Sequence, residues 1–113
     1  MNSKHPADLL HGTLDVLILK AVAAAPRHGY AIARWIEERT GGVFAIEDAA
    51  LYKALHRLEA QRALTSEWGQ SETNRRAKYY QVTARGRRLL QAEARVWERY
   101  AGAVAAVLRS EER

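Results

Sequence analysis

The stretch from Leu51 to Gly86 limits the possible folds of this chain more than any other segment. It begins with a helix-like segment, residues 51–59, in which leucines recur at three- and four-residue spacing. Two short segments typical of strands follow, residues 64–68 and 78–82, and a polar loop over residues 69–77 separates them. A further helix begins after the second strand. The order helix, strand, loop, strand, helix is that of a winged helix.

Two more helices are expected before this stretch. Apolar residues recur at helical spacing from residue 9 to 24, and Pro26 ends that helix. The next helix covers residues 29–39 and stops at Gly41. The short apolar segment 43–46 is interpreted as a small edge strand. The fold class is therefore mainly α (α+β), a winged helix-turn-helix with a long C-terminal helix.

The last helix is expected to span residues 84–109, about 39 Å at 1.5 Å per residue. Its apolar residues recur in steps of four and three, as in a heptad seam. Residues 1–83 alone cannot cover such a helix, so we expect a homodimer; the alternative is a helix folded back across its own domain. The expected interface residues are Leu10, Leu14, Leu90, Ala94, Trp97, Ala101, Val104 and Leu108.

The expected domains follow from this division. Residues 1–83 are expected to form the winged-helix domain, with residues 1–8 flexible. Residues 84–113 form the dimerisation helix and tail. No uninterrupted apolar stretch of membrane-spanning length occurs, so no transmembrane helix is expected.

The charge balance favours a polyanionic partner. The net charge is +5, and six basic residues and no acidic one lie between Arg75 and Arg88. The chain has no cysteine, which excludes disulfides, thiolate metal sites and cysteine nucleophiles and is compatible with a reducing cytoplasm. The histidines show no metal-ligand spacing, and no nucleophile motif or phosphate loop is present. We therefore expect no enzyme, metal or cofactor.

The third helix is the expected reader of double-stranded DNA. Asp48 is its expected N-cap, and its leucines face the core. Its outward side chains can enter the major groove, while the cations of the following hairpin hold the DNA backbone. A plain solvated basic face is the alternative for the helix taken alone. The expected DNA-binding residues are Tyr52, Lys53, His56 and Arg57 in the helix, and Arg75, Arg76 and Lys78 in the wing.

The aromatic residues receive separate assignments. Tyr80 shares a strand face with Val82 and is expected in the core, whereas the Tyr79 hydroxyl could touch the DNA backbone. Trp35 and Trp68 are assigned to the core or to domain packing. Trp97 lies on the heptad seam, where two indoles could either fill the interface or stack on a small planar effector.

Several phrases in the right order resemble the PadR family of bacterial transcriptional regulators, in its short form with a single C-terminal helix. They are GTLD at 12–15, HGY at 28–30, LY at 51–52, RLE at 57–59 and RAKYYQVT at 76–83, followed by Gly86. The resemblance spans residues 9 to about 109. It implies a dimeric winged-helix DNA binder, usually a repressor released by a small molecule or another signal, with a dimer built from the first and last helices. Some members bind flat aromatic compounds at that interface.

Two departures from the family pattern concern the third helix. Ala49 and Ala50 stand where the family often has a Gly, Ser or Thr, so a hydroxyl contact to phosphate is missing. Arg62 stands where the family favours glycine, and a left-handed conformation there would cost arginine more. From the residues and the resemblance together we expect a cytoplasmic homodimeric regulator with a roughly palindromic operator. The alternative function is a winged-helix adaptor for protein interactions.

Overall fold

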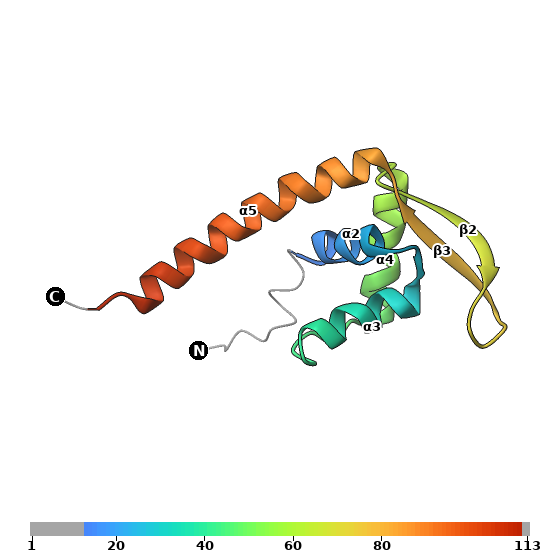
Figure 1. Cartoon of the computed structure of the whole chain (residues 1–113), viewed down its shortest axis with the longest axis horizontal. Coiled ribbons are helices and arrows are strands. Elements are labelled where there is room, and N and C mark those ends of the chain that lie inside the picture. Colours follow the sequence, from blue (N-terminus) through green and yellow to red (C-terminus); the bar gives the residue numbers. More distant parts are fainter. Residues whose placement is uncertain (1–12, 112–113) are drawn as a thin grey trace.

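The computed structural model of this chain describes residues 13–111, which form a helical domain with a small sheet and one long projecting helix (Figure 1). The strands form one antiparallel sheet in the order β1-β3-β2. This arrangement confirms the mainly α winged helix-turn-helix. The elements are α2 (Leu14–Ala24), β1 (Arg27–His28), α3 (Gly29–Arg39), α4 (Asp48–Ala60), β2 (Leu64–Gln70), β3 (Arg76–Val82) and α5 (Ala84–Arg109).

One apolar core joins α2, α3, α4 and the sheet. The leucine stripe expected on α4 is confirmed, because Leu51, Leu55 and Leu58 are at most 1% exposed. Tyr80 is buried as expected and closes the core from β3. Burial of each large apolar side chain stabilises the fold by roughly 1.5–3 kcal/mol. The largest fully buried side chains are Ile18, Leu19, Ile32, Ile36, Leu51, Leu55, Leu58 and Leu64.

The turn from α4 into β2 and the start of α5 are held together at one point. Arg62 has a φ of 63°, a left-handed conformation that costs arginine more than glycine. Thr83 caps α5, since its hydroxyl accepts a hydrogen bond from the Gly86 N–H at 2.9 Å. The same hydroxyl lies 2.7 Å from the Arg62 carbonyl oxygen, to which it donates. A methyl group on Gly86 would lie 2.1 Å from the Ala63 carbonyl oxygen, so only glycine fits there.

The prediction of an edge strand at residues 43–46 is wrong. This segment is irregular because its backbone donors bind groups near the end of α3 and not a neighbouring strand. The Val43 N–H donates to the Thr40 carbonyl oxygen, the Phe44 N–H to Thr40 Oγ1 and the Ile46 N–H to Glu37 Oε2. The third strand is instead β1, where Arg27 pairs with Tyr80.

Two helix starts also differ from expectation. The N-cap of α4 is Glu47 and not Asp48, which lies in the first turn, where a negative charge is favourable. The first helix was expected from residue 9, but α2 begins at Leu14, and residues 1–12 lie outside the described part of the chain. Residues 1–8, which were expected to be flexible, lie outside the described residues.

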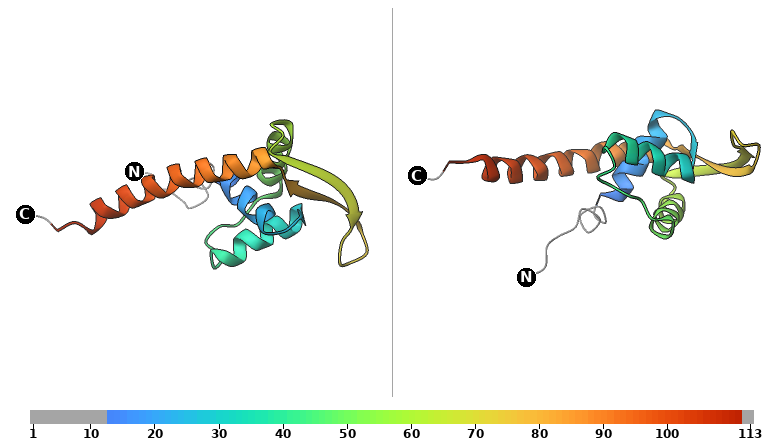
Figure 2. Two further views of the ribbon diagram at one scale, coloured as in Figure 1. Left: turned by 45° about the horizontal axis from the view of Figure 1, so that its top comes forward. Right: turned by 90° about the horizontal axis from the view of Figure 1, so that it is seen from below.

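Helix α5 starts above the domain and continues well past it. Figure 2 shows its C-terminal half extending away from the other helices, on the side opposite the β2–β3 hairpin. Leu89 and Leu90 pack against the core near its start, and Gly86 is its one buried residue within the described range. No helix within residues 13–111 is long and apolar enough to cross a membrane.

Candidate nucleic-acid interface

The exposed side of α4 carries all four side chains expected to read DNA. Tyr52 is 51% exposed, and Lys53, His56 and Arg57 are also exposed. Because the helical repeat is 3.6 residues per turn, Lys53 and His56 lie opposite the leucine stripe, in the middle of this side. Ala49, one turn earlier, lies on the same line and was not assigned a role from the sequence.

Tyr52 and Arg57 lie at the two borders of this exposed side. Tyr52 leans against the start of α3, where a methyl on Gly29 would lie 2.6 Å from the Tyr52 hydroxyl oxygen. Arg57 pairs with Asp15 of α2 at 2.5 Å, an ion pair whose side chains are 49% and 37% exposed. The sequence did not reveal this partner. Arg57 thus has its charge partly neutralised, whereas Lys53 and His56 do not meet a carboxylate within residues 13–111.

The three cations of the β2–β3 hairpin differ in the groups that they contact. Lys78 lies 3.5 Å from Glu59 of α4, so this cation also anchors the hairpin to the helix. Arg76 stacks over the Trp68 ring, with its guanidinium carbon 4.4 Å from the ring centroid. Arg75 is exposed near the tip of the hairpin. The wing cluster expected from the sequence is therefore divided into one anchored, one stacked and one free cation among the described residues.

Trp68 was assigned to the core or to domain packing, and the core assignment is wrong, because the residue is 58% exposed. Trp68 pairs with Lys78 across the sheet, two residues before β2 ends at Gln70, where the strand is more exposed than at its start. Trp35 is half-buried as expected, with Arg39 3.9 Å from its ring centroid. The length of the hairpin, which decides where the sheet leaves the core, could not be read from alternation alone.

The two tyrosines of β3 lie in different surroundings. Burial raises the pKa of the Tyr80 hydroxyl above its ordinary value, and the negative charge of Glu59 adds to that rise. Tyr79 donates its hydroxyl hydrogen to the Gln70 carbonyl oxygen at 2.9 Å, so this group is already engaged within the hairpin.

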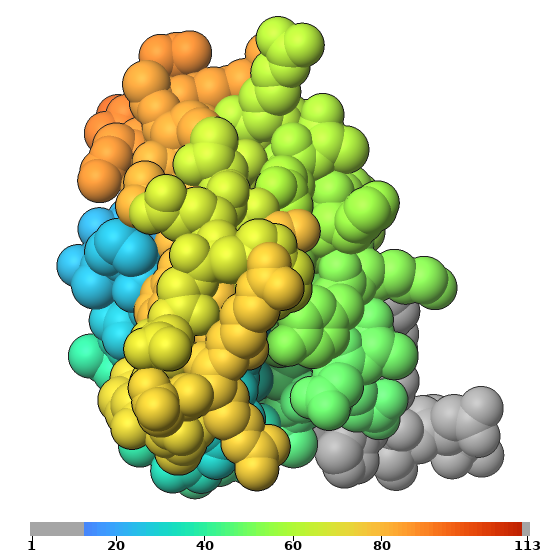
Figure 3. Space-filling view, turned by 90° about the vertical axis from the view of Figure 1, so that its right-hand side faces the viewer, coloured from blue at the N-terminus to red at the C-terminus, as the bar shows by residue number. Residues whose placement is uncertain are grey.

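A groove of about 740 Å³ separates the hairpin from the starts of α3 and α4. Figure 3 shows the hairpin and α4 side by side on this face of the molecule. One wall carries Trp68, Arg76 and Lys78, and the other carries Tyr30 and Tyr52. The groove therefore combines aromatic surfaces with cations, which suits the sugar–phosphate backbone of DNA.

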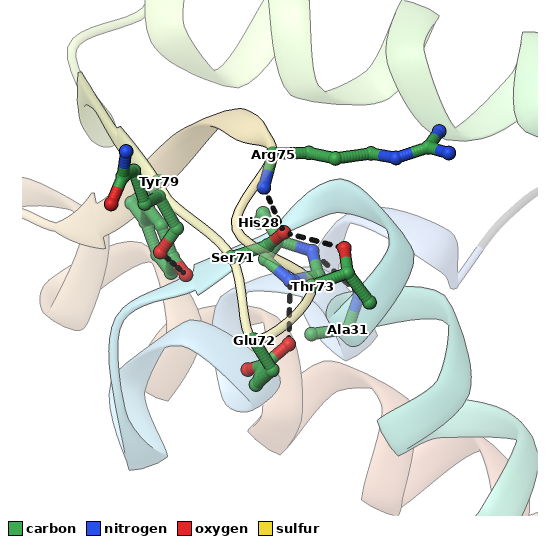
Figure 4. A network of polar contacts seen from close by, with 8 residues as sticks. His28, Ala31, Ser71, Glu72, Thr73, Arg75 and Tyr79 are labelled. Atoms are coloured by element: carbon green, nitrogen blue, oxygen red, sulfur yellow. Dashed lines mark hydrogen bonds and ion pairs between the residues drawn. The ribbon is translucent and has the colours of Figure 1, made fainter.

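His28 connects the hairpin tip to the helix-turn-helix (Figure 4). Its Nδ1 accepts a hydrogen bond from the Ala31 N–H at 3.2 Å and thereby caps α3. Its Nε2 lies 3.6 Å from a carboxylate oxygen of Glu72 in the hairpin loop, and its ring meets Tyr79 edge-on. A backbone hydrogen bond and the neighbouring His28 lower the pKa of the Glu72 carboxyl. The role of His28 as a cap and a wing contact was not deduced from the sequence.

The residues expected at a dimer interface differ in how far they are exposed in the single chain. Leu14 is 8% exposed and belongs to the chain's own core, and Leu10 lies outside the described residues. On α5, Leu90, Ala94 and Ala101 are half-buried, while Trp97, Val104 and Leu108 are 43%, 41% and 78% exposed.

A second groove, of about 590 Å³, runs between α2 and α5. Trp97, Leu90 and Ala94 line it from α5, and Leu17 lines it from α2. The Trp97 ring also stacks on Tyr100 one turn later, with ring centroids 5.7 Å apart. Within residues 13–111 no group of three or more metal-ligating side chains is close enough to hold a metal ion.

Comparison with known proteins gives a consistent result. The family model described as "Transcriptional regulator PadR-like family" matches residues 18–92, more than half of the chain. An uncharacterized protein X of Lysinibacillus sphaericus is 32% identical over 91 residues, which cover 80% of this chain and 84% of that protein.

Solved structures agree with that match. A PadR family transcriptional regulator from Eggerthella lenta is 31% identical, with a TM-score of 0.75 and coverage of 92% of this chain and 88% of that one. A transcriptional regulator from Clostridium thermocellum is 28% identical, with a TM-score of 0.78 and coverage of 88% and 96%. The chain therefore belongs to the PadR-like family of transcriptional regulators, and it is a DNA-binding regulator and not an enzyme.

Proposed function

We propose that this regulator binds a roughly palindromic operator as a homodimer and represses transcription. The observation that carries this proposal is the juxtaposition of the exposed side of α4 with the cation-bearing hairpin across one groove. A helix of this kind fits the major groove, and a hairpin beside it reaches the adjoining backbone. A bound repressor would act by occupying the promoter in the cytoplasm.

Lys53 and His56 are the proposed base readers, because they project furthest from the core. Ala49 precedes them on the same line, and its methyl group could contact a thymine methyl. Tyr52 and Arg57, at the borders of the exposed side, would contact the two flanking backbones. Arg75, Arg76 and Lys78 would hold the wing on phosphates.

The proposed dimer rests on the uncovered apolar line of α5. Trp97, Val104 and Leu108 are substantially exposed in the single chain, and such a line suits pairing with an identical helix. Two-fold symmetry would set the recognition helices about 34–36 Å apart if the half-sites are one turn apart. This spacing is the geometric reason for expecting a palindrome.

The proposed effector is a small planar molecule at Trp97. The α2–α5 groove offers a volume of about 590 Å³ beside the indole, and a second copy would add another wall. Binding of a planar cationic dye should quench tryptophan fluorescence. Trp97→Ala should abolish this quenching, whereas unchanged quenching in that variant would contradict the site.

The main test is fluorescence anisotropy with a labelled duplex from upstream of the protein's own gene and an unrelated duplex as control. The upstream duplex should bind more tightly, and affinity should fall by roughly 10³–10⁵ between 50 and 200 mM salt if about 6–10 phosphates are contacted. Lys53→Ala should reduce the preference for the upstream duplex. Arg99→Ala, which removes an equal charge from exposed α5, is the matched control. Absence of binding to either duplex at low salt would contradict the proposal and favour the adaptor.

Repression needs its own measurement. A reporter gene behind the upstream sequence should be silenced when the protein is expressed, and the planar effector should restore its expression. Increased reporter expression on addition of the protein would instead identify an activator.

A further inference from the structure

The wing carries an exposed tryptophan, Trp68, which is not part of the apolar core. Trp68 is 58% exposed although it lies within a regular strand, and Leu64 at the start of the same strand is 1% exposed. Tryptophan is enriched at interfaces because its ring combines a large apolar body with a polar N–H group. Trp68 faces the groove between the hairpin and α4.

The surroundings of Trp68 contain one specific interaction. The Arg76 guanidinium carbon lies 4.4 Å from the centre of its ring. Arg76 follows Trp68 diagonally across the hairpin, because Trp68 pairs with Lys78, and residues two apart on a strand share a face. Because Arg76 is the diagonal cross-strand neighbour of Trp68, its guanidinium can stack on the flat indole ring and is held there.

Arg76 differs from Lys78 and Arg57 in that no carboxylate of the described residues neutralises it. Lys78 is partly neutralised by Glu59 at 3.5 Å, and Arg57 by Asp15. Arg76 has no carboxylate within ion-pair distance among residues 13–111, so its charge and all its N–H donors remain available. A guanidinium stacked on one face keeps its edge free for two parallel hydrogen bonds to a phosphate.

We propose that Trp68 is a positioning residue for DNA binding, which holds the Arg76 guanidinium over the groove, ready to bind a backbone phosphate. This inference rests on the proposed DNA-reading face. A free arginine loses side-chain freedom when it binds, and prior stacking on the indole reduces that loss. Trp68 acts here through Arg76 and does not itself read bases.

The expected effects follow from the strength of exposed cation–π contacts. Trp68→Ala should weaken DNA binding roughly two- to five-fold per protomer. Trp68→Phe retains a flat ring and should keep most of the affinity. Arg76→Ala should weaken binding more and should lower the slope of log affinity against log salt by about 0.9 per phosphate lost. Since phosphates carry no sequence, the loss should be equal for the upstream duplex and an unrelated duplex.

The decisive experiment is a pair of double-mutant cycles measured by anisotropy with both duplexes. In the Trp68→Ala and Arg76→Ala cycle, the double variant should bind no more weakly than Arg76→Ala alone. In the control cycle with Arg75→Ala, the neighbouring exposed arginine, the effects should add. The melting temperature of each variant separates changes in DNA binding from changes in folding.

The outcomes separate this inference from the proposed function. Additive losses in the Trp68 and Arg76 cycle, or unchanged affinity in Trp68→Ala, would overturn the positioning role while leaving DNA binding by the unmodified protein intact. A loss confined to the upstream duplex would also overturn it, because it would indicate base reading. No binding by the unmodified protein at low salt would overturn the proposed function together with this inference.

Discussion

The winged-helix region and the C-terminal half of α5 differ in how their apolar side chains are covered. Every buried apolar side chain of the described chain lies between Leu14 and Tyr80. Helix α5 buries only Gly86, yet Val96, Tyr100 and Val107 on it are more than 60% exposed. The first region thus completes its core by itself, whereas the second presents an apolar surface without a cover in the single chain.

This difference separates two kinds of stability. Contacts within the winged-helix region act at any protein concentration. Contacts along α5 would act only when a second chain supplies the other half, so their contribution would depend on concentration. Single substitutions in each region test this distinction.

The largest effect is expected in the core. Leu55 of α4 is 0% exposed and belongs to the apolar core. Leu55→Ala should therefore lower the free energy of unfolding by about 2–5 kcal/mol, because burial is lost and a cavity is left. Chemical denaturation followed by circular dichroism measures this change. The shift should be the same at low and high protein concentration. A shift that vanishes on dilution would contradict the assignment of Leu55 to an intrachain core.

The next effect is expected on the α5 line. Trp97→Ala should weaken the proposed dimer by roughly 2–3 kcal/mol over both copies, because each indole would be covered by the partner. Sedimentation equilibrium measures the dissociation constant. Arg95→Ala, an exposed change on the same helix but off the apolar line, is the matched control. Equal dissociation constants for the unmodified chain and Trp97→Ala would remove Trp97 from the interface.

An effect of similar or smaller size is expected where the two regions join. Gly86→Ala would bring a methyl within 2.1 Å of the Ala63 carbonyl oxygen, which is backbone and cannot rotate away. Overpacking of this kind costs about 1–3 kcal/mol, measured as a lower midpoint of thermal unfolding. Gly102→Ala is the control, because no atom lies within 4 Å of a methyl added there. That control should retain or raise stability through better helix propensity.

The smallest effect is expected at the turn after α4. Here the substitution should raise the stability of the protein, whereas the preceding substitutions lower it. Arg62 adopts a φ of 63°, which glycine tolerates better, so Arg62→Gly should raise stability by about 0.5–1 kcal/mol. Arg62→Ala removes the same charge but keeps a β-carbon, so it should show no such gain. A gain of equal size in both variants would point to charge and not to backbone conformation.

Much of the fold could be predicted because the relevant signals are local. Leucine spacing in α4, the alternation in the hairpin and the cap at Thr83 each depend on neighbours in the chain. The strand prediction for residues 43–46 failed because apolar character alone does not show where backbone donors bind. The Glu37 carboxylate and the Thr40 hydroxyl receive them, and both contacts require the turn that follows α3.

The proposed site could be predicted as a set of residues but not as an arrangement. The basic wing and the outward side of α4 are visible in the pattern of charges. The Asp15 partner of Arg57 is 42 residues away in the chain, and that of Lys78 is on another element, so neither pairing has a local signal. The same holds for the exposure of Trp68.

The sequence by itself determined the helix order, the charged hairpin, the leucine stripe of α4 and the apolar line of α5, because periodicity and capping act over a few residues. Only the tertiary structure decided which cations are neutralised, that His28 caps α3 beneath the hairpin tip, and that Trp68 faces the groove beside Arg76. These features depend on distances between elements, which the packing of the shared core sets.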